Sequence, residues 1–301
     1  MKETFKKLLV RMPFIRNLDE QIKAQGAYPA GHFYSPIPSK NDVLEYTKSK
    51  SLPKMELQGI ELNKEGQFKL LEEFTKFYED IPFPERQTSG FRYYYENIYY
   101  SYSDAIFLHS FLRKYKPKRI IEVGSGFSSA VILDTVDRYF SFRPDISFID
   151  PYPERLRSLL NKEDENYVRI IEEKLQKLQL DFFTSLEAGD LLFIDSSHVV
   201  KCNSDLHFLF FNIIPLLKKG VFVHFHDVFY PFDYPSDWLN EGRYWNENYF
   251  LRAFLSNNSE WDICFFNTYV SLAFNEFIKK NMPLCVRNSG GSLYIQRNST
   301  N

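Results

Sequence analysis

Two apolar segments of this sequence each end in acids and histidines. One reads LLFIDSSH and supplies Asp195 and His198, and the other reads VFVHFHDV and supplies His226 and Asp227. If both segments are strands of one open parallel sheet, their carboxyl ends meet at the edge where such sheets bind ligands. Carboxylates and imidazoles gathered there could bind a divalent metal ion or move protons.

A glycine-rich turn lies upstream, in the segment IIEVGSGFSS at 120–129. An apolar strand ends there in glycines, which let the backbone turn tightly and approach a ligand, and a helix follows. Ser128 or Ser129 is well placed to cap that helix. Ser129 stands where a dinucleotide fingerprint has its third glycine, which argues against NAD or FAD. The next strand ends in FID, and Asp150 at its tip is either a ribose ligand or a solvated strand-end acid.

The elements that must position these residues alternate between strand and helix after residue 102. Such alternation predicts an α/β fold: a Rossmann-like, doubly wound, seven-stranded and mostly parallel sheet, plus an N-terminal extension. The last two strands lack a crossover helix between them, so we expect the last strand to run antiparallel. Strands are expected at 119–123, 145–149, 167–171, 191–194, 221–225, 261–269 and 292–296. Helices are expected at 64–78, 104–114, 128–138, 154–160, 176–186, 205–217 and 249–255.

The glycine turn and the acid after the second strand resemble the first two cofactor motifs of S-adenosylmethionine-dependent methyltransferases. The likeness is carried by EVGSG at 122–126 and by ID at 149–150, and it extends from about residue 99 to the end of the chain. It implies that Asp150 holds the ribose and that Gln176 contacts the adenine, with Lys174 or Leu175 as alternatives. The cofactor-binding residues that the resemblance implies are Glu122, Gly124, Ser125, Gly126, Ser128, Asp150 and Gln176.

The acids and histidines resemble the strand ends of metal-dependent O-methyltransferases of the catechol and macrolide-sugar types. These enzymes carry an acid after the fourth strand, a base three residues later and two adjacent ligands after the fifth strand. The resemblance implies a divalent metal, Mg, Mn or Fe, on Asp195, His226 and Asp227. It makes His198 the general base and Asp195 a catalytic residue as well. His226 stands where a carboxylate is usual, which favours a softer ion; His226 could instead bond only to backbone, and Asp227 could cap a loop.

The sequence therefore predicts an enzyme that uses S-adenosylmethionine to methylate an oxygen of a hydroxylated small molecule, a sugar or a natural product. A bound metal ion would lower the pKa of the hydroxyl, and a histidine could take its proton. One alternative is a metal-dependent oxygenase on the same fold, resembling cephalosporin hydroxylase. The other is a non-catalytic binding or assembly protein.

Composition indicates which partners and which compartment to expect. The net charge of −2 over 301 residues gives no field for nucleic acid, so we expect none as a partner. No apolar run approaches the roughly 20 residues of a membrane span. Cys202, Cys264 and Cys285 form no zinc or disulfide pattern, which predicts a reducing compartment, the cytoplasm. We expect a partly helical N-terminal extension at 1–90 and a methyltransferase domain at 91–301. A homo-oligomer is possible, and a tight oligomer through the N-terminal segment would favour the binding or assembly protein.

Overall fold

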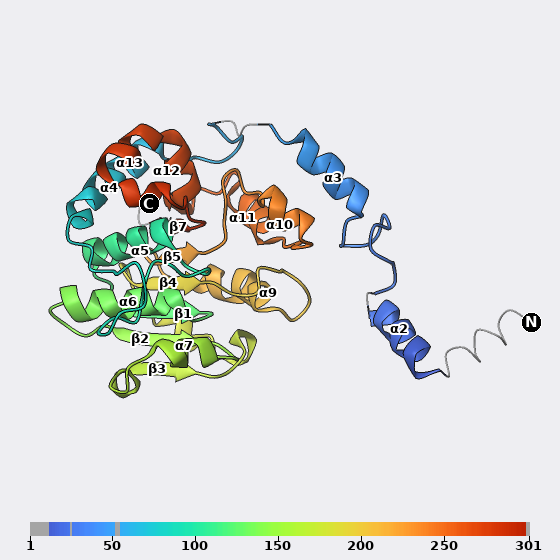
Figure 1. Cartoon of the computed structure of the whole chain (residues 1–301), viewed down its shortest axis with the longest axis horizontal. Helices are drawn as coiled ribbons and strands as arrows, with labels where there is room; N and C mark the ends of the chain where they lie inside the picture. Colours follow the sequence, from blue (N-terminus) through green and yellow to red (C-terminus); the bar gives the residue numbers. More distant parts are fainter. Residues whose placement is uncertain (1–11, 25, 52–54, 299–301) are drawn as a thin grey trace, which may run out of the picture. The chain divides into compact units, whose positions relative to one another are not determined.

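The computed structural model describes residues 12–24, 26–51 and 55–298, and its contacts divide the chain into two units (Figure 1). The smaller unit joins the described residues up to 51 with Tyr234–Tyr244. It contains α2 (Pro13–Ala24), α3 (Lys40–Ser49) and α10 (Ser236–Asn240). The larger unit holds residues 55–233 and 245–298 and carries every motif singled out above. None of the described helices is long and apolar enough to cross a membrane.

The larger unit is built on one seven-stranded sheet, as the alternation predicted. Its strands are β1 (Arg119–Val123), β2 (Asp145–Ile149), β3 (Val168–Ile171), β4 (Leu191–Ile194), β5 (Phe222–Phe225), β6 (Trp261–Phe266) and β7 (Leu293–Arg297). They lie in the order β3-β2-β1-β4-β5-β7-β6. Strands β1 to β5 pair in parallel, and β7 is antiparallel to both of its neighbours. The strand order reverses between β1 and β4, which is where doubly wound sheets bind ligands.

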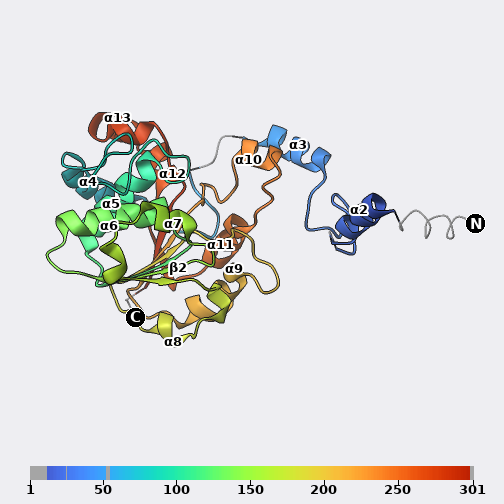
Figure 2. The same ribbon diagram turned by 60° about the horizontal axis from the view of Figure 1, so that its bottom comes forward.

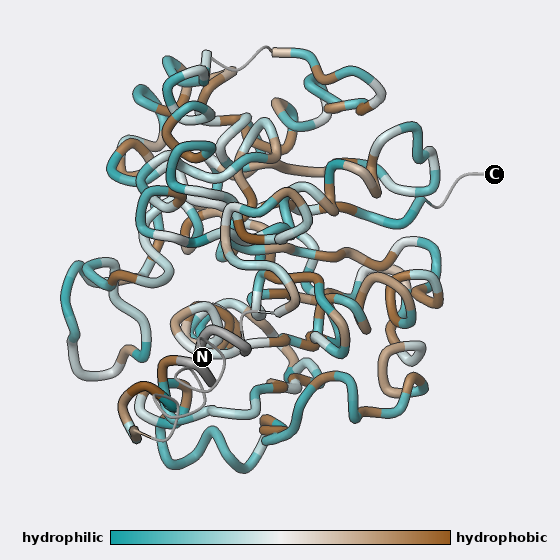
Figure 3. Tube along the Cα trace, turned by 90° about the vertical axis from the view of Figure 1, so that its right-hand side faces the viewer, coloured by the Kyte–Doolittle hydropathy of each residue, from teal (hydrophilic) through white to brown (hydrophobic). Residues whose placement is uncertain are grey.

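Helices cover both faces of this sheet. They are α4 (Lys64–Tyr78), α5 (Tyr102–Tyr115), α6 (Phe127–Tyr139), α7 (Glu154–Leu159), α8 (Asp181–Thr184), α9 (Asp205–Phe208), α11 (Glu247–Leu255), α12 (Asn267–Ala273) and α13 (Asn275–Asn281). Figure 2 shows α5 and α6 on one side of the sheet and α8 and α9 on the other. In Figure 3 the hydrophilic stretches predominate in the projecting loops. A parallel sheet needs such cover because its strands are apolar on both faces.

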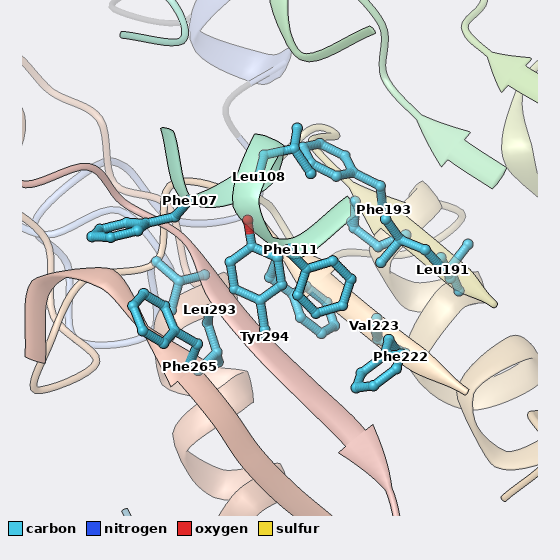
Figure 4. Packing of buried hydrophobic residues seen from close by; sticks show 14 of the residues in the cluster. Phe107, Leu108, Phe111, Leu191, Phe193, Phe222, Val223, Phe265, Leu293 and Tyr294 are labelled. Carbon is cyan, nitrogen blue, oxygen red and sulfur yellow. The ribbon is translucent and has the colours of Figure 1, made fainter. Parts of the chain in front are cut away.

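Aromatic rings pack α5 onto the middle of the sheet (Figure 4). Phe111 of α5 has its ring 5.0 Å from that of Phe222 on β5 and 4.8 Å from that of Tyr294 on β7. All three side chains are buried. This packing holds the C-terminal half of α5 against the start of β5 and against β7.

Three predicted elements differ from the structure. Residues 176–186 are not one helix, because the backbone is extended at Leu178 between a 3-10 turn and α8. The helix expected at 205–217 becomes α9, a π turn and a 3-10 turn that contains Pro215, whose nitrogen cannot donate to a preceding carbonyl. The strand expected at 261–269 ends at Phe266, where α12 begins.

Helix α4 was expected within the N-terminal extension, but its contacts join it to the larger unit. Leu71 and Phe74 are buried, and the ring of Phe74 lies 5.2 Å from that of Phe265 on β6. The contacts therefore divide the chain near residue 52 rather than near residue 90. Residues 1–11 of the expected N-terminal extension lie outside the described residues.

Candidate active site

The turn between β1 and α6 is shaped by Gly124. Its φ is +78°, in the left-handed region that glycine adopts without strain. A Cβ there would lie 1.6 Å from the backbone oxygen of Asp195, so only glycine lets the turn approach the end of β4. Helix α6 begins with Gly126 as its N-cap, and not with Ser128 or Ser129. The hydroxyl of Ser129 instead accepts a hydrogen bond from the Gly126 N–H at 3.0 Å.

Glu122 supports this turn from inside the protein. Its side chain is wholly buried, and its two oxygens accept hydrogen bonds from the hydroxyls of Ser128 at 2.5 Å and Ser129 at 2.7 Å. Burial raises the pKa of Glu122 to about 8. Glu122 and Ser128 thus hold the turn in shape, and neither lines the cavity described below.

Asp150 ties the end of β2 to the same turn. Its Oδ2 accepts hydrogen bonds from the N–H and the hydroxyl of Ser125, at 3.0 and 2.9 Å. Its Oδ1 accepts from the N–H of Tyr152 at 2.8 Å. These bonds orient the half-buried carboxylate beside the cavity, which it lines together with Ser125.

One cavity of about 570 Å³ joins the glycine turn to the acids and histidines. Its volume falls in the range of small-molecule and cofactor sites. Eight of the residues singled out from the sequence line it: Gly124, Ser125, Asp150, Gln176, Asp195, His198, His226 and Asp227. Gln176 enters from the turn after β3, where its side-chain amide donates to the backbone oxygen of Asn203 at 2.8 Å. Gly126 does not line the cavity.

The acids and histidines form one cluster at the ends of β4 and β5. Nε2 of His198 lies 3.6 Å from Asp195 Oδ1 and 3.5 Å from Asp227 Oδ2. Nδ1 of His226 lies 3.4 Å from Asp195 Oδ1 and 3.7 Å from Asp227 Oδ1. His198 and Asp227 both have left-handed backbones, with φ of +57° and +59°. Such conformations are uncommon outside glycine and concentrate at functional sites.

This cluster has the donor atoms that a divalent metal ion needs. Asp195, His198 and Asp227 each offer a ligand atom, and these atoms lie within 4.8 Å of one another. The metal set expected from the sequence has His226 in place of His198. Nδ1 of His226 is buried and makes no hydrogen bond with the described residues, yet it faces the same two carboxylates. An unbonded buried nitrogen beside two carboxylates fits a metal ligand.

Two buried carboxylates behind the histidines were not singled out from the sequence. Glu247, in the first turn of α11, has Oε2 2.8 Å from Nδ1 of His198. Asp104, in the first turn of α5, has Oδ2 3.6 Å from Nε2 of His226. No local pattern marks either residue, because each lies far along the chain from its histidine. Only the amphipathic helix predicted at 104–114, with an acid at its start, hinted at Asp104.

The cluster contains more acidic groups than basic groups. Burial would lower the pKa of His198, but the hydrogen bond to Glu247 and the surrounding carboxylates raise it to about 9. Among the described residues, the only positively chargeable groups within ion-pair distance of Asp195 and Asp227 are the two histidines. When Glu247 and Asp104 are included, four carboxyl groups face two imidazoles. A dication bound there would displace the imidazole protons and balance the charge.

Comparison with known proteins identifies the class of this domain. A family model described as a methyltransferase domain matches residues 121–228, from β1 to just beyond β5. An uncharacterized protein of Archaeoglobus fulgidus is 34% identical over 166 residues, which are 53% of this chain and 74% of that protein. The chain belongs to the S-adenosylmethionine-dependent methyltransferase family. The matched segment contains both the glycine turn and the acid–histidine cluster.

Solved structures of methyltransferases are similar to this chain at low identity. The methyltransferase PaMTH1 of Podospora anserina, bound to S-adenosylhomocysteine, is 15% identical with a TM-score of 0.41. That match covers 87% of this chain and 98% of PaMTH1. The O-methyltransferase TomG of Streptomyces achromogenes, in complex with S-adenosylmethionine, is 14% identical with a TM-score of 0.40. That match covers 86% of this chain and 96% of TomG.

Proposed function

We propose that the protein transfers the methyl group of S-adenosylmethionine to a hydroxyl oxygen of a small-molecule acceptor, a sugar or another hydroxylated natural product. The observation that carries the proposal is the single cavity that joins the glycine turn to the acid–histidine cluster. The two halves of a methyl transfer, a cofactor site and groups that activate a hydroxyl, meet in it. All three cysteines are free, so we also propose a reducing compartment, the cytoplasm.

The cofactor half of the cavity holds the donor. Gly124 and Ser125 line the cavity and present backbone to the methionine part. Asp150 accepts hydrogen bonds from the ribose hydroxyls, and Gln176 lies beside the adenine. Gly126 starts α6, while Glu122 and Ser128 maintain the turn through their hydrogen bond.

The other half activates the acceptor. Asp195, His226 and Asp227 would hold a divalent ion, which when bound lowers the pKa of an acceptor hydroxyl. Nε2 of His198 faces Asp195 and Asp227 and takes the hydroxyl proton. The oxygen then forms a bond to the methyl carbon as the carbon–sulfur bond breaks, which leaves S-adenosylhomocysteine and a methyl ether.

The test is an assay of the purified protein with S-adenosylmethionine and a panel of hydroxylated sugars and phenols. We expect S-adenosylhomocysteine and a methylated product, detected by mass spectrometry, in amounts that EDTA abolishes and that added Mg²⁺, Mn²⁺ or Fe²⁺ restores. Turnover unaffected by EDTA would contradict the metal part of the proposal. Iron-dependent hydroxylation of an acceptor, with no S-adenosylhomocysteine formed, would contradict the proposed methyl transfer and support the oxygenase alternative.

A further inference from the structure

We propose that Glu247 and Asp104 are positioning residues that fix the two active-site histidines in opposite tautomers. Each carboxylate lies at one ring nitrogen of a histidine, so that the other ring nitrogen faces the space between Asp195 and Asp227. His198 carries its hydrogen on Nδ1 and presents Nε2, whereas His226 carries its hydrogen on Nε2 and presents Nδ1. This inference rests on the proposed function, in which Nε2 of His198 takes a proton and Nδ1 of His226 binds a metal ion.

The pair formed by Glu247 and His198 is tightly held. Their 2.8 Å contact lies between side chains that are 1% and 9% exposed. The backbone oxygen of His198 accepts hydrogen bonds from the N–H groups of Asn246 and Glu247, at 3.2 and 3.3 Å. The start of α11 therefore fixes His198 through both its backbone and its ring. The ring of Trp245 lies 4.4 Å from the imidazole and restricts its rotation further.

The carboxylate of Glu247 has no hydrogen-bond partner other than His198 in the part of the structure that is described. Its Oε1 is buried and makes no hydrogen bond with any described residue. A buried carboxylate with a single partner costs stability, and an apolar residue of similar volume would pack at lower cost. What the carboxylate supplies is the choice of which His198 nitrogen carries the hydrogen.

Asp104 is oriented toward His226 by the hydrogen bonds that its Oδ1 accepts. Oδ1 of Asp104 accepts hydrogen bonds from the Gly291 N–H at 2.9 Å and the Ser292 hydroxyl at 2.6 Å. It also accepts one from the Asn267 side-chain amide at 3.0 Å. With Oδ1 committed to three donors, Oδ2 is left facing Nε2 of His226 at 3.6 Å. A carboxylate there favours an Nε2–H and leaves the Nδ1 lone pair free to bind a metal ion.

This arrangement makes Asp104→Asn an informative change. The three donors can be satisfied only by the amide oxygen, so the NH₂ group would face Nε2 of His226. Two donors cannot share that contact, and the ring would move its hydrogen to Nδ1, where it blocks the metal. An isosteric change of an acid to an amide is known to leave a histidine in place but in the wrong tautomer. Glu247→Gln perturbs His198 in the same way, without affecting His226.

The experiment combines Zn²⁺ titration calorimetry with NMR of the ¹⁵N-labelled imidazoles in the Zn²⁺-loaded protein. For the wild type we expect Zn²⁺ binding and two active-site histidines with opposite tautomers. Asp104→Asn should weaken Zn²⁺ binding by ~10- to 100-fold and reverse the His226 pattern alone. Glu247→Gln should disturb the His198 pattern alone. The affinity for S-adenosylmethionine should be the same in each variant as in the wild type. This unchanged affinity would show that the variants fold.

Asp190→Asn is the matched control. Asp190 is also a buried acid, but it lies at the opposite end of β4, where it accepts hydrogen bonds from the N–H groups of Arg119 and Glu187. This control should keep wild-type Zn²⁺ affinity. The same tautomer for both histidines in the wild type, or unchanged Zn²⁺ affinity in Asp104→Asn, would overturn the inference and leave the proposed function standing. A wild-type protein that binds S-adenosylmethionine but no metal would overturn both the inference and the metal part of the proposed function.

Discussion

The two halves of the cavity are built in different ways. The cofactor half comes from one continuous stretch of chain: Glu122, Gly124, Ser125 and Asp150 lie at two consecutive strand ends, and hydrogen bonds join residues no more than 25 positions apart. The acid–histidine half is assembled from four distant parts of the chain, the starts of α5 and α11 and the ends of β4 and β5. A half built from local contacts can be recognised from a motif. A half built from tertiary contacts shows only its strand-end residues in the sequence.

Removing the proposed base should affect the acid–histidine half alone. We expect His198→Gln to lower kcat for methyl transfer by ~10²- to 10⁴-fold, because the acceptor hydroxyl keeps its proton. The affinity for S-adenosylmethionine should not change, since the cofactor half is untouched. The measurement is steady-state kinetics with any acceptor found in the panel, together with calorimetry of cofactor binding.

His207→Gln is the control for this prediction, because His207 is an exposed histidine of α9 that does not line the cavity. It should keep wild-type kinetics. A His198→Gln enzyme with full kcat would contradict the assignment of the base.

A second change breaks the cofactor half alone. Gly124→Ala should weaken S-adenosylmethionine binding by ~10- to 100-fold, since each tenfold step corresponds to ~1.4 kcal/mol. Its Cβ would clash with the backbone of Asp195, and its left-handed φ costs a further ~1–2 kcal/mol of stability. Calorimetry gives the affinity, and chemical denaturation gives the free energy of unfolding.

Gly189→Ala separates these two costs. Gly189 has φ of +89°, but an added Cβ would meet nothing within 4 Å. This variant should lose stability through backbone strain and still bind the cofactor normally. Equal cofactor affinity in both variants would show that the close approach at Gly124 does not matter for binding.

The smallest expected effect concerns the buried acid beneath the turn. Glu122 has its pKa raised from 4.5 to about 8, so the folded protein keeps a proton that the unfolded chain releases above pH 4.5. The folded state binds more protons than the unfolded state between these two pH values. The contribution of Glu122 to stability is therefore present below pH 4.5 and is lost as the pH rises to about 8. Glu122→Gln should remove this loss. We expect its stability relative to the wild type to rise by ~1–3 kcal/mol between pH 5 and pH 8, measured by urea unfolding.

Constant relative stability over that range would show that Glu122 is ionised in the folded protein at pH 5. The two serine hydroxyls that donate to it would then suffice to hold its charge.

The sequence was most informative where the determinants of structure are local. The bounds of β1, β2 and β4 were predicted correctly because apolar runs there are closed by polar or glycine residues. Helix α12 was missed because its start at Asn267 is set by tertiary contacts: the side chain of Asn267 donates to Asp104, far away in the chain. The same limit applies to the site. His198 could be proposed from its spacing to Asp195, but its partner Glu247 lies 49 residues further on and only the fold brings the two together.

We propose that the glycine turn and Asp150 form the S-adenosylmethionine site of this cavity. The most direct test is titration calorimetry with S-adenosylmethionine, with and without Mg²⁺ or Mn²⁺, on the wild type and on Asp150→Ala, with Asp145→Ala at the far end of β2 as control. We predict a wild-type dissociation constant of ~1–100 μM. Asp150→Ala should weaken binding by ~10- to 100-fold, because it loses the anchor of Ser125 and the ribose contact together. No binding by the wild type under any metal condition, or full affinity in Asp150→Ala, would contradict the claim.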